Sequence, residues 1–88
     1  MAWTIEFARS AEKALAKLDR PTAHRIVRFL KERVAIDRRS TGEPLKGEFS
    51  EFWRYRVGDY RLYATIDDAR ITVLVVKLGH RREVYRRK

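Results

Sequence analysis

The chain has 88 residues, which fits a single domain with a modest core. Hydrophobic residues make up 44% of it and charged residues 38%, a balance that excludes a disordered chain, and no apolar run is long enough to cross a membrane. The formal net charge is +9, so we expect a polyanionic partner, either a nucleic acid or an acidic protein.

The composition also limits the kinds of site. The chain has no cysteine and only two histidines, His24 and His80, which lie far apart in the sequence. Disulfides and thiolate metal sites are excluded, and we expect neither a histidine metal site nor a cofactor. The N-terminus shows no basic-then-apolar leader, so we expect no secretion signal and a cytoplasmic location.

The first half of the chain has the pattern of one strand and two helices. Apolar residues alternate from Trp3 to Phe7, as in a half-buried strand. Ser10 is placed to cap a first helix, which ends near Pro21, where a second helix can begin. The second helix has an apolar stripe and an opposite charged face, formed by Ala23, Ile26, Val27, Leu30 and Val34 and by Arg25, Arg28, Lys31 and Glu32. Residues 40–44 have the composition of a loop.

The second half is organised around a β-hairpin. Residues 52–57 and 60–66 alternate with period two around a two-residue link that contains glycine. So short a link pairs Arg56 with Arg61. It places Trp53, Tyr55, Val57, Tyr60, Leu62 and Ala64 on one face, and Arg54, Arg56, Arg61 and Tyr63 on the other.

Three arginines on one face of a hairpin require an explanation. Like charges that face each other across strands destabilise a sheet, so we interpret this face as a binding site for an anion. The alternative is that Arg54 and Arg56 are the solvated face of an outer strand.

The last strand and the element order define the predicted fold. Residues 71–78 form a near-continuous apolar run typical of an interior strand, and Gly79 is predicted to end it. The order strand, helix, helix and three strands predicts a two-layer α+β domain over residues 1–88. Its two N-terminal helices pack on one face of a four-stranded, mainly antiparallel sheet, and a short basic tail can lie near the hairpin.

Three motifs together resemble the RelE/ParE superfamily of bacterial toxins, and most closely its RelE branch. They are Pro44-Leu45-Lys46-Gly47, Tyr60-Arg61-Leu62-Tyr63 and Gly79-His80-Arg81-Arg82-Glu83-Val84-Tyr85. The resemblance implies a toxin of a type II toxin–antitoxin system that cuts messenger RNA in the A site of the 70S ribosome, without a metal. It also implies a cognate antitoxin that blocks the toxin and through which the complex binds operator DNA. The alternative is the ParE branch, which poisons DNA gyrase and has no nuclease site.

The resemblance further implies roles for individual residues. In that family the ribose 2′-hydroxyl attacks the adjacent phosphate, and preorganised cations stabilise the charge that develops. Arg61 matches an arginine that grips phosphate, and Arg81 matches one credited with stabilising the transition state. Tyr85 matches a tyrosine that stacks on or orients the nucleotide, although its ring could instead pack the tail onto the sheet.

One departure from the RelE pattern concerns proton transfer. Arg54 and Arg56 stand where a RelE toxin has two lysines, one of them with an acid–base role, and a guanidinium stays protonated. His80 is the neighbouring side chain of the type that exchanges protons near neutral pH, so we hypothesise that it supplies proton transfer; the alternative is a strand-end histidine bonded to the backbone. The predicted RNA-binding set is Lys46, Arg54, Arg56, Arg61 and Arg82.

Overall fold

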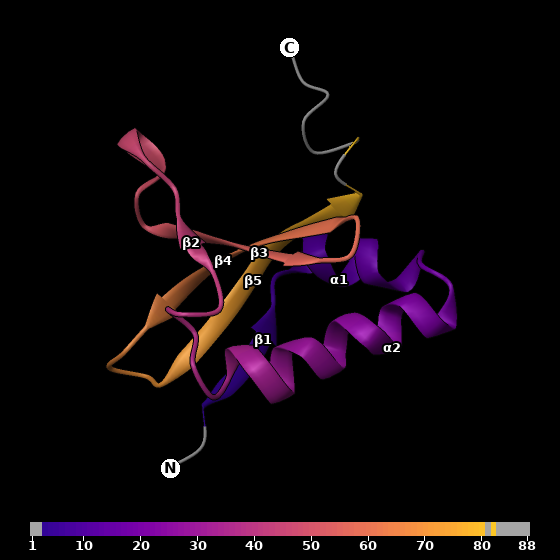
Figure 1. Cartoon of the computed structure of the whole chain (residues 1–88), viewed down its shortest axis with the longest axis horizontal. Coiled ribbons are helices and arrows are strands. Elements are labelled where there is room, and N and C mark those ends of the chain that lie inside the picture. Colours follow the sequence, from indigo (N-terminus) through magenta and orange to yellow (C-terminus); the bar gives the residue numbers. More distant parts are fainter. Residues whose placement is uncertain (1–2, 81, 83–88) are drawn as a thin grey trace.

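The computed structural model describes residues 3–80 and 82, and it places two helices against one face of a twisted sheet (Figure 1). Helix α2 (Arg20–Phe29) continues directly into a π-helical turn, η1 (Leu30–Val34), and a 3₁₀ turn, η2 (Gly47–Phe49), precedes strand β3 (Phe52–Val57). The other elements, in chain order, are β1 (Thr4–Phe7), α1 (Arg9–Ala16), β2 (Glu43–Pro44), β4 (Tyr60–Asp67) and β5 (Thr72–His80). None of the helices in these residues is long and apolar enough to span a membrane.

The sheet has five strands in the order β1-β5-β4-β3-β2. Strand β1 runs parallel to β5, and the other neighbouring strands are antiparallel. The predicted α+β class and two-helix layer are confirmed, but the predicted count of four strands is wrong. The fifth strand, β2, has only two residues, which is too short for any alternation of apolar and polar residues to reveal it.

The helix starts differ from the prediction in one respect. Ala8, not Ser10, is the N-cap of α1, and it makes no side-chain capping hydrogen bond. The Ser10 hydroxyl instead donates to the carbonyl of Val76, 2.8 Å away, and so ties α1 to β5. At the start of α2 the Asp19 carboxylate accepts a hydrogen bond from the N–H of Thr22, the expected capping arrangement.

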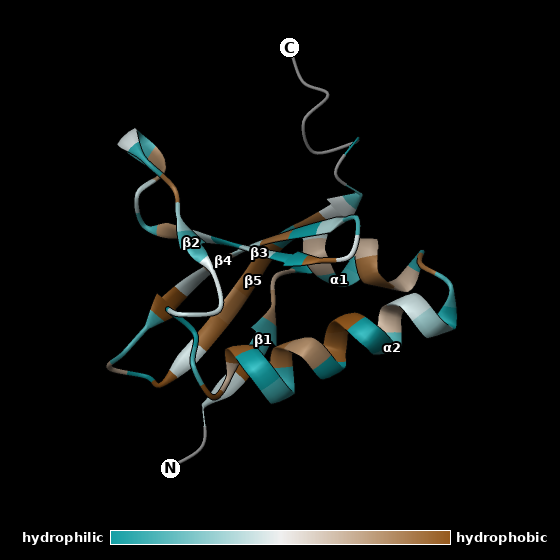
Figure 2. Cartoon of the chain, in the orientation of Figure 1, coloured by the Kyte–Doolittle hydropathy of each residue, from teal (hydrophilic) through white to brown (hydrophobic). Residues whose placement is uncertain are grey.

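The core lies between the helices and the sheet. In Figure 2 the ribbon of β5 is largely apolar, whereas α2 carries both apolar and polar segments, as an amphipathic helix should. The buried apolar side chains are Ala11, Ile26, Leu30, Val34, Tyr55, Val57, Leu62, Ala64, Val73, Val75 and Leu78. They include Ile26, Leu30 and Val34 from the predicted stripe of the second helix, whose other two positions, Ala23 and Val27, are half-buried. The charged face of this helix is exposed as predicted.

Strand β5 contains a bulge. Ala64 pairs with Val75 and Tyr63 pairs with Lys77, so Val76 is an extra residue in the ladder. One extra residue inverts the side to which every later side chain points. Lys77 therefore shares a face with Tyr63. Strand β5 runs to His80, through Gly79, which was predicted to end it.

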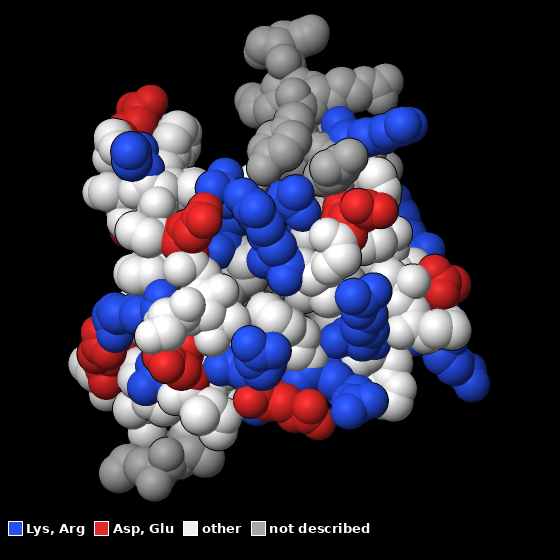
Figure 3. All heavy atoms as spheres, viewed as in Figure 1, with Lys and Arg blue, Asp and Glu red and all other residues white. Residues whose placement is uncertain are grey.

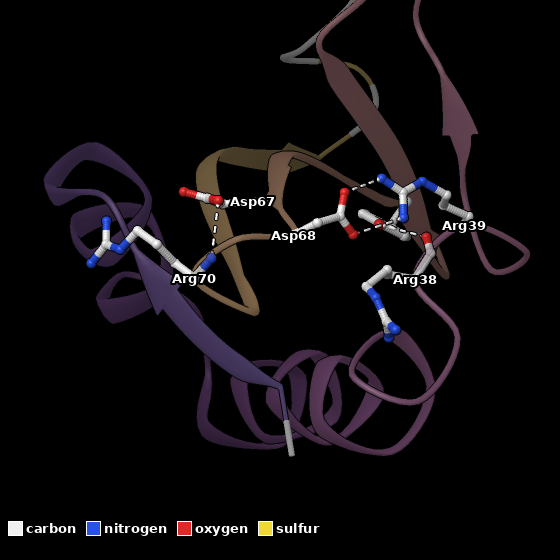
Figure 4. Close-up of polar contacts among 6 residues, drawn as sticks. Arg38, Arg39, Asp67, Asp68 and Arg70 are labelled. Carbon is white, nitrogen blue, oxygen red and sulfur yellow. Dashed lines mark hydrogen bonds and ion pairs between the residues drawn. The ribbon is translucent and has the colours of Figure 1, made fainter. Parts of the chain in front are cut away.

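The loop between η1 and β2 is anchored at several points (Figure 4). The Arg39 guanidinium donates two hydrogen bonds to the Asp68 carboxylate, at 3.2 and 2.9 Å. The buried Tyr55 hydroxyl donates to the carbonyl of Arg38, at 2.7 Å, and the Arg38 guanidinium lies 3.8 Å from the centroid of the Trp3 ring. These contacts fix the loop that delivers β2 to the edge of the sheet.

Gly42 allows that loop to pass close to the sheet. A Cβ at this position would lie 2.5 Å from Cε1 of Tyr55 and 2.9 Å from the carbonyl oxygen of Arg54. Both distances are shorter than van der Waals contact, so only glycine fits without movement of the loop or the ring. The residue that follows Gly42 is the first residue of β2.

Candidate nucleic-acid interface

The hairpin gathers three arginines on one face. Gly58 adopts a positive φ of 60° in the two-residue link, which glycine tolerates without strain. The resulting register pairs Arg56 with Arg61 and Arg54 with Tyr63, as predicted. Because side chains of directly paired residues project to the same side, these three arginines share one face of the sheet, defined here as the arginine face.

Strand β2 adds a carboxylate to the arginine face. Glu43 pairs with Arg54, and its Oε1 lies 2.5 Å from Nη2 of Arg54 and 4.0 Å from Nη2 of Arg56. The hydrogen bond from Arg54, and then the charges of both arginines, hold the pKa of the Glu43 carboxyl below its usual range. The two guanidinium groups thus already face an oxygen anion, one supplied by the chain itself.

Sequence reasoning missed Glu43 because it belongs to a polar segment that reads as a loop. The one available signal is its position directly before the Pro44-Leu45-Lys46-Gly47 motif. Its contact explains how the Arg54 guanidinium can be half-buried beside the short edge strand β2.

Arg61 lies deeper than its neighbours. It is only 8% exposed, and its Nη1 lies 3.4 Å from the carbonyl oxygen of Gly58 and 3.3 Å from that of Tyr60. In the sheet it stands between Arg56 on β3 and Gly79 on β5. A guanidinium held in this way is a fixed positive charge that needs little reorganisation before it meets an anion.

Lys77 is a second residue that sequence reasoning missed. It is exposed, and its pairing with Tyr63 puts it on the arginine face. The signal was present, since Lys77 is the single charged residue in the apolar run of residues 71–78. Regular alternation from the buried Val73 and Val75 would have turned Lys77 toward the core, and the bulge at Val76 prevents this.

His80 is not brought to the arginine face. It pairs with Tyr60, whose side chain points away from that of Arg61, and the two rings meet edge to face with centroids 5.4 Å apart. Its side chain shares a concave surface with α1, and its Nδ1 accepts a hydrogen bond from the N–H of Arg82, at 3.2 Å. His80 was expected beside the arginines, and the bulge at Val76 is what turns its side chain to the opposite face.

The other predicted site residues are placed as follows. Lys46 and Arg82 are both exposed, and Lys46 lines a concave surface together with Glu43 and Arg54. Arg81 and Tyr85 lie outside the described residues. Within residues 3–80 and 82, no three histidine, aspartate or glutamate side chains are grouped as a metal site would require.

Comparisons with known proteins agree with this architecture. The family of the ParE toxin of the type II toxin–antitoxin system parDE matches residues 5–85. Toxin RelG from Mycobacterium tuberculosis is 32% identical over 87 residues, which cover 99% of this chain and 100% of that protein.

Solved structures show the same fold. The toxin–antitoxin complex RelBE2 from Mycobacterium tuberculosis contains a chain that superposes with a TM-score of 0.85, at 29% identity over 91% of this chain and 99% of that one. The isolated RelE toxin from E. coli superposes with a TM-score of 0.75, at 22% identity over 90% of this chain and 84% of that one.

Proposed function

The chain belongs to the RelE/ParE superfamily of type II toxin–antitoxin toxins, and from this premise we propose that it is an endoribonuclease that cuts translated messenger RNA on the 70S ribosome. The proposal treats residues 1–88 as one toxin domain, acting in the cytoplasm where translation takes place. The observation that carries it is the opposition of Arg56 and Arg61 across β3 and β4, beside Arg54. Such a cluster of like charges destabilises the sheet when nothing is bound, but it would stabilise a bound phosphodiester.

The proposed reaction is an internal displacement at phosphorus. The ribose 2′-hydroxyl gives its proton to a base as its oxygen bonds to the adjacent phosphorus. The bond to the 5′-oxygen of the next nucleotide breaks, and that oxygen takes up a proton, so that a cyclic phosphate and a 5′-hydroxyl are formed. Negative charge builds up on the phosphoryl oxygens in the transition state, and fixed cations that stabilise this charge lower the activation barrier of the reaction directly. We assign this role to Arg61 and Arg81, phosphate binding to Arg54 and Arg56, and orientation of the nucleotide to Tyr85.

Proton transfer has two candidate groups. His80 is the group that the sequence favours, but it projects on the α1 side of the sheet. Glu43 is the carboxylate that contacts Arg54 and Arg56, and its lowered pKa keeps it ionised, so it can accept the proton of the 2′-hydroxyl, although with reduced basicity. Separate Glu43→Gln and His80→Gln variants distinguish the two, because the cleavage rate should fall only for the residue that transfers the proton.

We further propose that a cognate antitoxin binds this toxin. The RelBE2 structure and the intact E. coli RelBE structure are both toxin–antitoxin complexes. A net charge of +9 suits an acidic antitoxin segment that folds as it binds. Binding of operator DNA would then occur through the antitoxin.

The test is induction of the chain alone in a bacterial host. We expect growth to stop and primer extension to reveal cuts within translated messages, while Arg61→Ala restores growth and leaves messages intact. Arg70→Ala is the matched control, because it removes one exposed arginine from the β4–β5 turn, away from the arginine face. Undiminished killing by Arg61→Ala would remove the basis of the proposal.

A second candidate function is inhibition of DNA gyrase. It is favoured by the match to the ParE family and by arginines in place of the two lysines of a RelE toxin. Under this alternative, induction produces DNA breaks and an SOS response while messages stay intact. The same cultures can be assayed for both effects.

A further inference from the structure

Three adjoining hollows run along one side of the molecule. The first, of about 600 Å³, lies between α2 and the β3–β4 link and is lined by Arg25, Arg28, Arg33 and Arg56. The second, of about 260 Å³, shares Arg33 and Arg56 with the first and adds Arg54 and Glu43. The third, of about 500 Å³, shares Arg54 and Glu43 with the second and ends at Lys46. Neighbouring hollows share lining residues and therefore adjoin one another, and the three together are defined here as the α2 groove.

We propose that the α2 groove binds single-stranded RNA and holds the strand that leads away from the phosphate at the arginine face. This inference rests on the proposed function, since it extends the same site from the hairpin to α2. It adds Arg25, Arg28 and Arg33 as contacts for phosphates that are not cut. Arg56 belongs to both parts, because it lines the groove and stands opposite Arg61.

The charges of the groove favour a chain of phosphates. Six cations line it, and the carboxylates in it are those of Glu32 and Glu43. Glu32 pairs with Arg28, at 3.5 Å, on the exposed side of the helix. Figure 3 shows lysine and arginine side chains gathered over α2 and the neighbouring strands, with acidic side chains beside them at several points. Cations spaced along a groove suit a polymer with one negative charge at every nucleotide.

The groove also contains an aromatic ring. Phe29 lines its first two hollows and is half-buried, and the guanidinium of Arg33 lies 5.9 Å from the centroid of its ring. An aromatic ring beside an arginine is a platform on which an unpaired base can stack, a contact that tolerates any sequence. An acidic peptide would use the cations but has no need of this platform.

Arg25 is held at the rim of the groove, over the hairpin link. Its Nη1 would lie 3.1 Å from a Cβ placed at Gly58. Its guanidinium therefore bridges from α2 to the end of β3, and it connects the helix to the strand that carries Arg56. This position brings a cation of α2 next to the hairpin that carries the arginine face.

The experiment measures binding of RNA that cannot be cut. The wild-type chain is titrated with 2′-O-methyl RNA of about 4 and about 12 nucleotides, the range of single-strand site sizes, over a series of salt concentrations. We expect the longer RNA to bind more tightly. The double variant Arg25→Ala/Arg33→Ala should weaken its binding about tenfold, and the slope of log affinity against log salt should fall by about 1.4, or roughly 0.7 for each lost phosphate contact.

A control variant and a competitor make the result decisive. Lys13→Ala/Lys17→Ala removes the same charge from the groove beside α1 and should leave the slope unchanged. Equal effects of the two double variants would mean a general charge effect and would overturn the proposal. Polyglutamate of matched length is the competitor. The proposal would also be overturned if polyglutamate competed as well as RNA and lost the same affinity in the Arg25→Ala/Arg33→Ala variant, since the groove would then be a site for acidic peptides.

Failure of this inference differs from failure of the nuclease proposal. If the groove does not bind RNA, the Arg25→Ala/Arg33→Ala variant cuts messages like wild type, while Arg61→Ala is inactive. If the chain is not a nuclease, wild type cuts nothing but still binds the uncleavable RNA with a slope that depends on Arg25 and Arg33.

Discussion

Arg56 and Arg61 stand directly opposite each other in the β3–β4 ladder, yet Arg56 is exposed and Arg61 is only 8% exposed. One of the two cations is therefore fixed within the sheet while the other reaches into the α2 groove. The pair combines a buried charge with an exposed one, an arrangement that suits the proposed binding of a phosphodiester.

The first prediction is that Arg56→Thr separates stability from activity. Removing one of two facing like charges should stabilise the fold by about 0.2–1 kcal/mol, since threonine also suits a strand. The same change should weaken RNA binding and growth arrest. Urea unfolding and a growth assay measure the two effects, with Arg70→Thr as a control for the loss of charge. A loss of stability would show that Arg56 supports the fold.

The second prediction concerns acid. Arg54 and Arg56 lower the pKa of the Glu43 carboxyl from 4.5, so the folded protein favours the ionised form of this side chain. Its contribution to the free energy of unfolding is therefore present above pH 4.5 and is lost as the pH falls through the lowered folded pKa. Glu43→Gln should be less stable than wild type at neutral pH, and the difference should vanish in acid. It should also bind uncleavable RNA more tightly, because a competing anion has been removed from the groove. A difference that persists unchanged in acid would contradict this account.

The third prediction is that Gly42→Ala disturbs β2. The added methyl group meets the Tyr55 ring and the Arg54 carbonyl at distances that force the loop to move. Overpacking of this kind costs about 1–3 kcal/mol, and the moved loop should carry Glu43 away from Arg54. Hydrogen exchange of the Leu45 N–H, which donates to the carbonyl of Phe52 at the end of β2, should rise in the variant. Gly47→Ala is the matched control for an exposed loop glycine with open space around it, where only the cost of its positive φ is expected.

The fourth prediction concerns alkali. Burial raises the pKa of the Tyr55 hydroxyl to about 12 from 10.0, so folding favours the neutral phenol. Its contribution to stability is complete below pH 10.0 and is lost as the pH rises toward about 12. Tyr55→Phe removes the donor to the Arg38 carbonyl and should cost about 0.5–1.5 kcal/mol near neutral pH. Its stability should then fall less steeply than that of wild type above pH 10.0, as measured by urea unfolding over an alkaline series.

The hairpin could be predicted from the sequence because a two-residue link allows only one pairing register between the two strands. That register fixed the pairing of Arg56 with Arg61, as well as the apolar face that carries Tyr55 and Leu62. The apolar stripe of α2 was equally clear, since its period of 3.6 residues spans several turns.

The features that escaped prediction have no local signal. Strand β2 exists because the anchored loop lays Glu43 and Pro44 beside β3, and two residues cannot show a period. The bulged residue is Val76, which directly follows an identical β-branched residue, Val75, so alternation gave no sign of where the faces change. The side of His80 follows from that bulge, and therefore depended on information that the residues near it do not contain.

The final prediction tests the bulge through Lys77. If Lys77 projects on the arginine face, Lys77→Leu should change the free energy of unfolding by less than about 0.5 kcal/mol, as is usual for an exposed site. It should also weaken binding of uncleavable RNA and lower the salt slope by about 0.7, because one phosphate contact is lost. A regular strand would point Lys77 toward the core, where leucine would stabilise the fold and leave RNA binding unchanged. Lys31→Leu, an exposed change on η1, serves as the control. Because the two geometries predict opposite patterns of stability and affinity, a single pair of measurements decides which side of β5 carries this charge.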